Sequence, residues 1–177
     1  HNGRHKARLC ANGNLTEIPI DSVYSGVVSL KSLRTVIFLA ELNNLEAWAT
    51  DIGNAYLEAE TSEKVFVVAG PEFGELEGHT LVIFKALYGL RSSGLRWSEK
   101  LSLCLRDMGF SPSKADPCIW MRRVDDHYEH IAVYVDDLAI ASKDPASIIR
   151  TLTDDHKFKL KGTGPIEFHL GCDFFRY

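Results

Sequence analysis

The sequence predicts an α+β domain, built on an antiparallel sheet with helices packed on one face. Apolar residues make up 45% and charged residues 25% of the 177 residues, the balance of a globular domain. Short β-branched and aromatic runs alternate unevenly with longer amphipathic stretches, which favours α+β over regular βαβ units. Two β-forming runs near the middle are separated by Asp136 and Asp137, which indicates a hairpin.

The first half of the chain is predicted to hold one helix and three strands. Apolar residues recur at helical spacing within residues 29–48, and Ser29 is suited to the N-cap. A strand-like run follows at residues 46–51. Two more strands are expected at residues 64–69 and 80–84, because these runs are rich in β-branched and aromatic residues.

The second half is predicted to hold two helices and several strands. A helix is expected over residues 93–108, ending at Gly109. Another is expected over residues 146–158, with Pro145 in its first turn. The strands are expected in 117–122, 128–134 and on both sides of the two aspartates, with one or two closing strands in 166–177.

Composition restricts the classes of function. The net charge of −4 provides no overall basic field, so a nucleic acid would have to meet a local basic patch. The four cysteines form no Cys-x-x-Cys pair, which disfavours a zinc site and favours a reducing compartment. No apolar stretch approaches the roughly 20 residues of a membrane span. We expect an intracellular piece of a longer polypeptide, with no membrane partner.

The most informative residues are Asp136 and Asp137, because apolar residues flank them on both sides. Carboxylates in such a context are costly unless they are paired, hydrogen-bonded or bound to a cation. Asp51 ends another strand-like run, and together these acids could form an oxygen-only site suited to Mg²⁺. Spacing leaves open whether they meet, and leaves open that Asp136 and Asp137 are solvent-facing turn residues.

Seven ordered motifs carry a resemblance to a known family. Tyr134-Val135-Asp136-Asp137 resembles the polymerase box of reverse transcriptases, and the order of the other motifs resembles the copia-type LTR retrotransposon branch. The match runs from about residue 5 to residue 175. The other motifs are His5-Lys6-Ala7-Arg8-Leu9, residues 24–29 with Leu33-Arg34, residues 51–57, residues 85–91 with Arg96-Trp97, Gly109-Phe110 with Asp116-Pro117-Cys118, and His169-Leu170-Gly171.

The resemblance implies a reverse-transcriptase palm with partial fingers, as a single fingers/palm domain over residues 1–177 that lacks thumb and ribonuclease H. Asp51 and Asp136 would be the principal ligands of two Mg²⁺ ions, with Mn²⁺ as a substitute. Asp137 would be a weaker ligand, and the backbone of Ile52 a further one.

The resemblance also implies a nucleotide site. Lys6 and Arg8 would contact the phosphates, Tyr56 would lie under the sugar and exclude a 2′-hydroxyl, and Gly89 would allow close approach of nucleotide or template. From the residues alone, the alternatives are a solvated basic segment, a core aromatic residue and a simple turn. Lys159 and Lys161 are weaker candidates for a cation that protonates the leaving pyrophosphate, because an exposed solvated face explains them better.

The resulting hypothesis is an enzyme: the RNA-directed DNA polymerase (nucleotidyltransferase) domain of a copia-type retrotransposon polyprotein. Its partners would be primer–template, deoxynucleoside triphosphates and the remainder of the polyprotein. It would act in the cytoplasm, in virus-like particles or in the nucleus. The main alternative is a catalytically silent fragment or co-opted descendant that binds nucleic acid or serves as a structural subunit. A metal-dependent nuclease is disfavoured, because it would not need Lys6, Arg8 and Tyr56.

Overall fold

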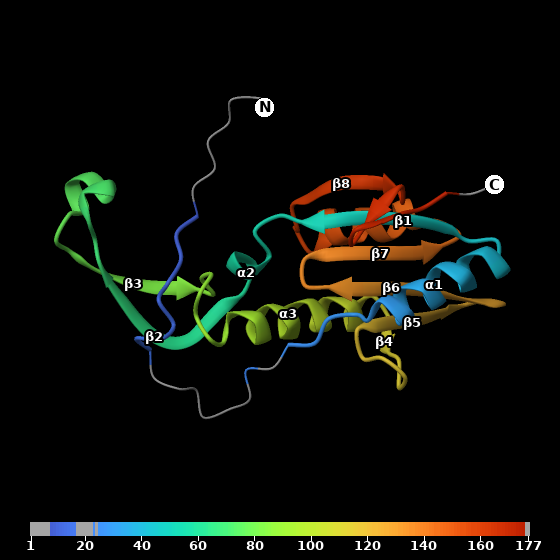
Figure 1. The fold of residues 1–177 in the computed structure, drawn as a ribbon, viewed down its shortest axis with the longest axis horizontal. Helices are drawn as coiled ribbons and strands as arrows, with labels where there is room; N and C mark the ends of the chain where they lie inside the picture. Colours follow the sequence, from blue (N-terminus) through green and yellow to red (C-terminus); the bar gives the residue numbers. More distant parts are fainter. Residues whose placement is uncertain (1–7, 17–22, 24, 176–177) are drawn as a thin grey trace. The chain divides into compact units, whose positions relative to one another are not determined.

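The computed structural model describes residues 8–16, 23 and 25–175 (Figure 1). The chain divides into two compact units. Unit 1 comprises His1–Ser25 and Tyr56–Lys100, and unit 2 comprises Gly26–Ala55 and Leu101–Tyr177. Among the described residues, no helix has the length and apolar character that crossing a membrane requires.

Unit 2 is built on a six-stranded sheet in the order β4-β5-β6-β7-β1-β8, and every neighbouring pair of strands is antiparallel. This confirms the predicted antiparallel sheet. A separate two-stranded sheet pairs β9 with β10, the predicted closing strands. The strands of this unit are β1 (Glu46–Ile52), β4 (Ser111–Pro112), β5 (Ile119–Val124), β6 (His127–Tyr134), β7 (Asp137–Ser142), β8 (Leu160–Pro165), β9 (Phe168–His169) and β10 (Cys172–Asp173).

Helix α1 (Leu30–Leu42) begins at the predicted N-cap, where the Ser29 hydroxyl accepts a hydrogen bond from the Ser32 N–H at 3.1 Å. The helix ends earlier than the apolar spacing suggests. Asn44 has a φ of 55°, a left-handed conformation that turns the chain out of the helix. Leu45 is fully buried after this turn, so its apolar side chain belongs to the core without belonging to the helix.

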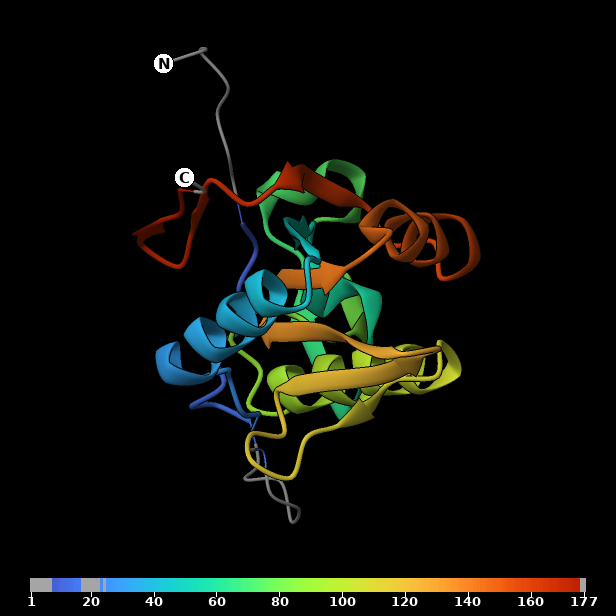
Figure 2. The same cartoon turned by 90° about the vertical axis from the view of Figure 1, so that its right-hand side faces the viewer.

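Helices cover both faces of the sheet, although the sequence predicted one. Helix α1 packs in one core cluster with Ala132, Ala139 and Ala141 (Figure 2). Trp120 is paired with Ile131, so alternation along the strands places it on the other face. There the Arg106 guanidinium of α3 (Ser93–Asp107) lies 5.3 Å from the Trp120 ring centroid. Because Leu138–Ala141 are apolar without interruption and all buried, both faces of β7 need cover.

The end of unit 2 differs in detail from the prediction. Helix α4 (Pro145–Arg150) is capped by Asp144, whose carboxylate accepts from the Ser147 N–H at 3.0 Å. A π-helical turn (Thr151–Asp155) continues it, so the helix stops short of residue 158. Strand β8 was not predicted, because two glycines and a proline interrupt residues 160–165.

Unit 1 contains a β-hairpin of β2 (Glu60–Val68) and β3 (Thr80–Lys85), joined through a 3₁₀ segment at Pro71–Leu76. Strand β3 contains the predicted run 80–84, and β2 contains the predicted run 64–69 except for Ala69. The short helix α2 (Ala55–Glu58) follows β1 and leads into the hairpin. The N-terminal segment joins this unit through a hydrogen bond of 2.7 Å from the Ala11 N–H to the Tyr88 carbonyl.

Candidate functional site

The two central aspartates lie at a hairpin tip, as predicted. Strands β6 and β7 pair up to Tyr134 and Asp137, so Val135 and Asp136 form a two-residue loop. Val135 has a φ of 56°. In hairpin loops, glycine or asparagine usually adopts this left-handed backbone conformation. A β-branched residue such as Val135 is strained in the same conformation. Strain of this kind concentrates at functional sites, where the surrounding structure holds it in place.

Asp51 reaches the same hairpin through the pairing of β1 with β7. Asp51 and Asp137 are register partners, and the Ile52 N–H donates to the Asp136 carbonyl at 2.8 Å. That hydrogen bond makes Asp51 and Asp137 a non-hydrogen-bonded pair, in which opposed side chains approach most closely. The structure therefore brings Asp51, Asp136 and Asp137 together at one end of the sheet, where the Ile52 backbone is hydrogen-bonded to that of Asp136.

The electrostatics of the cluster follow from this packing. All three carboxylates are half-buried. Burial raises the pKa of Asp137, and the negative charges of Asp136 and Asp51 raise this pKa further. The three acids therefore repel one another, and a cation among them would relieve that repulsion.

The three acids offer a possible donor set for a divalent metal. Within residues 8–16, 23 and 25–175, no group of three or more His, Cys, Asp or Glu side chains is arranged as a metal-holding cluster. Chemically the set still fits, because it offers only oxygen atoms and concentrates negative charge, as Mg²⁺ requires. The residues that could hold such an ion are Asp51, Asp136 and Asp137, with the backbone of Ile52.

Strand β8 adds a basic residue beside the acids. Lys161 is the register partner of Asp51 on the side of β1 away from β7. The sequence favoured a solvated face for Lys159 and Lys161, since nothing in it indicated that β8 lies next to β1. Asp51 and Lys161 thus become neighbours only through the pairing of β1 with β8.

In unit 1, two predicted nucleotide-binding residues meet on one aromatic ring. The Arg8 guanidinium lies 4.3 Å from the centroid of the Tyr88 ring. The rings of Tyr56 and Tyr88 have centroids 4.7 Å apart and planes tilted by 42°. Sequence reasoning assigned no role to Tyr88, although it lies within the quoted motif of residues 85–91. Lys6 lies outside the described residues.

Contacts within the chain explain why position 89 is a glycine. Its φ is +91°, and a Cβ added there would lie 1.9 Å from the Ala11 carbonyl oxygen. The missing side chain therefore makes room for the backbone of the N-terminal segment. The predicted approach of a nucleotide or template to Gly89 stays a prediction.

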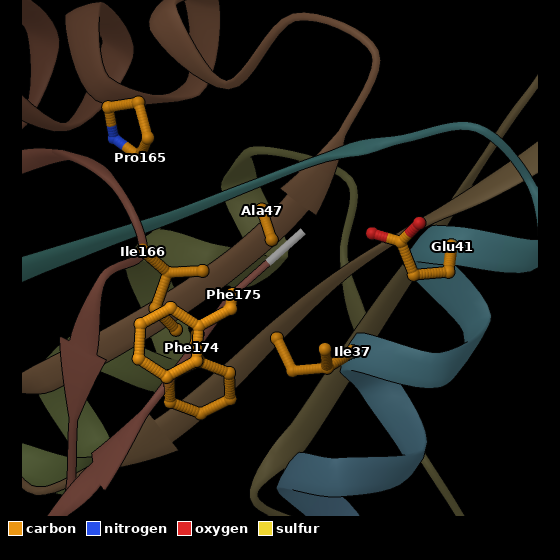
Figure 3. Close-up of a pocket in the computed structure, with 7 residues that line it drawn as sticks. All are labelled: Ile37, Glu41, Ala47, Pro165, Ile166, Phe174 and Phe175. Atoms are coloured by element: carbon orange, nitrogen blue, oxygen red, sulfur yellow. The ribbon is translucent and has the colours of Figure 1, made fainter. Parts of the chain in front are cut away.

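A mainly apolar cavity of about 390 Å³ lies elsewhere in unit 2 (Figure 3). Ala47 on β1 lines it, near the strand end opposite to Asp51. The cavity is therefore separate from the cluster of acids. The other lining residues are Ile37, Glu41, Pro165, Ile166, Phe174 and Phe175.

Comparison with known proteins identifies the family. Residues 1–177 match the family described as "Reverse transcriptase (RNA-dependent DNA polymerase)". The chain belongs to the reverse transcriptase family. This confirms the predicted copia-type reverse transcriptase and, with the antiparallel sheet and its helices, the α+β fold class.

Relatives of this reverse transcriptase domain are Pol polyproteins. It is 30% identical over 98% of its length to the Retrovirus-related Pol polyprotein from transposon TNT 1-94 of Nicotiana tabacum, covering 14% of that protein. It is 28% identical over 96% of its length to the Pol polyprotein from transposon RE1 of Arabidopsis thaliana, covering 12%. It is 29% identical over 97% of its length to the Ty1-DR5 Gag-Pol polyprotein of Saccharomyces cerevisiae, covering 10%. The chain thus spans a small part of each relative.

Proposed function

We propose that this chain carries the polymerase site of an RNA-directed DNA polymerase, within a palm with partial fingers. The observation that carries the proposal is the direct opposition of Asp51 and Asp137 beside the hairpin loop that holds Asp136. A fold gains no stability from three half-buried carboxylates that repel one another, so a role in catalysis explains them better.

Asp51 and Asp136 would be the principal ligands of two Mg²⁺ ions, or of Mn²⁺ in their place. Asp137 and the Ile52 backbone would be further ligands. Such ions, when bound, lower the pKa of a primer 3′-hydroxyl and neutralise charge on the triphosphate as pyrophosphate leaves. The chain itself contributes by holding the ligand carboxylates in position. The β1–β7 ladder holds Asp51, and the strained loop at Val135 holds Asp136.

The substrates would be deoxynucleoside triphosphates and a primer–template. In unit 1, Arg8 with Lys6 would contact phosphates, and Gly89 would lie close to nucleotide or template. Tyr56 would lie under the sugar, where the adjacent Tyr88 ring limits its movement. An aromatic ring at that position would exclude a 2′-hydroxyl by steric overlap, which would select deoxynucleotides.

Primer extension tests the polymerase proposal. The chain is incubated with Mg²⁺, dTTP and oligo(dT) on a poly(rA) template, and compared with the double variant Asp136→Asn/Asp137→Asn. We expect extension by the wild type and none by this variant. The matched control is Asp125→Asn/Asp126→Asn, because Asp125 and Asp126 form the two-residue loop between β5 and β6.

The outcomes of that experiment separate the alternatives. Extension retained in both double variants would contradict the assignment of the acids. A wild-type chain that extends nothing would contradict the polymerase proposal for this chain, and would favour the catalytically silent, nucleic-acid-binding descendant.

Sugar selection tests the assignment of Tyr56. Replacing Tyr56 by Ala removes the ring, so the preference for dTTP over UTP should fall about tenfold or more, equivalent to about 1.4 kcal/mol. Tyr128→Ala is the control, because Tyr128 is an exposed aromatic residue on β6. Equal sugar preference in wild type and Tyr56→Ala would remove Tyr56 from the nucleotide site.

A further inference from the structure

Another cavity in unit 2, of about 400 Å³, lies between helix α1 and strands β5 and β6. Its apolar lining comes from Val36 and Leu39 of α1 and from Ile119 and Met121 of β5. His130 of β6, the register partner of Met121, also lines it. Pockets that bind small molecules have this size and a mainly apolar lining, with a few polar groups that fix the orientation of the ligand.

His130 has a buried nitrogen atom for which the described part of the chain provides no hydrogen-bond partner. Only 5% of this residue is exposed, and the unpaired atom is Nδ1. A buried polar atom left unpaired lowers the stability of the fold, so it calls for an explanation. Among the described residues, His127 and His169 also have such a nitrogen, but neither lines this cavity. A molecule bound in the cavity can supply the partner that His130 lacks.

Other polar groups around the cavity already have partners in the chain. The Thr35 hydroxyl donates to the Lys31 carbonyl at 3.0 Å. The Asp116 carboxylate accepts from the Ser29 N–H at 3.4 Å, which joins the start of α1 to the loop between β4 and β5. The imidazole of His130 is therefore the buried group that remains to orient a ligand.

We propose that this cavity binds a small, uncharged aromatic molecule whose hydroxyl group forms a hydrogen bond with Nδ1 of His130. This binding site is independent of the proposed polymerase function. A hydroxyl both donates and accepts, so it can pair with Nδ1 in either tautomer of a neutral imidazole. Burial lowers the pKa of His130, although the charge of Glu129 opposes this, so the ring is neutral at pH 7.5.

The lining of the cavity favours an uncharged aromatic ligand. Lys31 and Asp116 bring one charge of each sign to it, so an ion of either sign would meet repulsion as well as attraction. Burying an ion against the apolar lining would also be costly. The thioether of Met121 makes favourable contacts with aromatic rings. The volume is at the lower end of the range for ligand pockets, which suits a molecule of one or two rings.

A binding experiment with matched probes tests the inference. Ligand-detected NMR at pH 7.5, without Mg²⁺ or nucleic acid, measures the Kd of p-cresol and of toluene, which lacks only the hydroxyl. We expect p-cresol to bind about tenfold more tightly than toluene, because it forms a hydrogen bond with a buried group. A third probe, 4-methylbenzoate, carries a carboxylate in place of the hydroxyl and should bind about tenfold more weakly than p-cresol or worse.

The variant His130→Phe tests the hydrogen bond, because it keeps an aromatic ring and removes both nitrogens. The Kd of p-cresol should rise about tenfold and that of toluene should not, so the preference for p-cresol should disappear. The Tm of this variant at pH 7.5 should be no lower than that of the wild type, because the lost Nδ1 has no partner in the described chain. His79→Phe is the control, because His79 is an exposed histidine of unit 1.

The variant Thr35→Trp tests the location of the bound probe. Thr35 is exposed on α1 and lines the cavity, so a tryptophan there can fill the space with little effect on the fold. Both p-cresol and toluene should then bind about tenfold more weakly or worse. Arg34→Trp is the matched control, because Arg34 is the preceding exposed residue of α1 and does not line the cavity.

The outcomes decide each part of the inference separately from polymerase activity. A wild-type chain that binds neither p-cresol nor toluene overturns the inference, because the cavity then holds water alone. An equal preference for p-cresol in the wild type and His130→Phe overturns the role of His130. Binding of 4-methylbenzoate as tight as that of p-cresol overturns the uncharged class of ligand. Unchanged p-cresol binding in Thr35→Trp overturns the assignment to this cavity.

Discussion

Asp51 on β1 and Asp137 on β7 lie directly opposite each other, in a non-hydrogen-bonded pair of an antiparallel ladder. Like charges in such a pair destabilise the sheet. The fold keeps them together with Asp136 in the adjoining loop, which increases the repulsion. This cost in stability has measurable consequences.

Replacing Asp137 by Asn should stabilise the fold at pH 7 without Mg²⁺. Burial and the charges of Asp136 and Asp51 raise the pKa of Asp137 above its unfolded value near 3.8. A raised pKa means that the contribution to stability is complete below pH 3.8 and is lost as pH rises through the folded pKa. The ionised group therefore opposes folding at pH 7. Thermal unfolding measures the gain in stability, because each 1 kcal/mol of unfolding free energy raises the Tm of a chain of this size by about 2–4 °C.

Mg²⁺ provides the second half of this test. Added Mg²⁺ should raise the Tm of the wild type, because it binds the folded cluster, and should raise the Tm of Asp137→Asn less. Asp173→Asn is the control, because Asp173 is exposed on β10. A lower Tm for Asp137→Asn than for the wild type at pH 7 would contradict the repulsion.

Replacing Gly89 by Ala should destabilise the chain by about 2 kcal/mol or more. An alanine Cβ would overlap the Ala11 carbonyl oxygen at 1.9 Å, and Gly89 has a φ of +91°. Gly78→Ala is the matched control, because Gly78 has a similar φ of +79° and nothing within 4 Å of an added Cβ. Denaturant unfolding should show the larger loss for Gly89→Ala, and equal losses would exclude the contact with Ala11.

Replacing Glu129 by Leu should lower the free energy of unfolding by about 3 kcal/mol. Only 7% of the Glu129 side chain is exposed, and its Oε2 accepts from Arg122 at 2.6 and 3.0 Å while its Oε1 accepts from the Ser142 hydroxyl at 2.5 Å. The substitution removes the carboxylate that neutralises the Arg122 guanidinium, which keeps only the Met108 carbonyl and the Phe110 ring as partners. The double variant Arg122→Met/Glu129→Leu should therefore recover much of the stability, and additive losses in denaturant unfolding would argue against a coupled pair.

Acidification should destabilise unit 2 through two buried histidines. Burial lowers the pKa of His130, although the charge of Glu129 opposes this, and burial lowers the pKa of His169. A histidine with a lowered pKa stabilises the fold above its unfolded pKa near 6.5, and this stability is lost as pH falls through the folded pKa. The unfolding free energy should decrease from pH 7.5 to pH 5.5. The decrease should be smaller in His130→Phe and unchanged in His79→Gln, where the residue is exposed.

Several parts of the fold could be predicted because their signals are local. The Ser29 cap, the hairpin at Asp136 and the strand carrying Asp51 each follow from a few adjacent residues. Strand β8 could not, because its glycines weaken β propensity and its pairing with β1 stabilises it from outside. The end of α1 at Leu42 was missed because Leu45 fits the helical spacing and is buried after a turn.

For the candidate site, the family and the three acids follow from the sequence, because Tyr134-Val135-Asp136-Asp137 and its companion motifs are ordered along the chain. The residues that lie beside these acids become known from the folded arrangement of the strands. The opposition of Asp51 to Asp137, and of Asp51 to Lys161, depends on the register of strands that are distant in sequence. Register is set by which side chains are buried across the whole sheet, and no local run of residues carries that information.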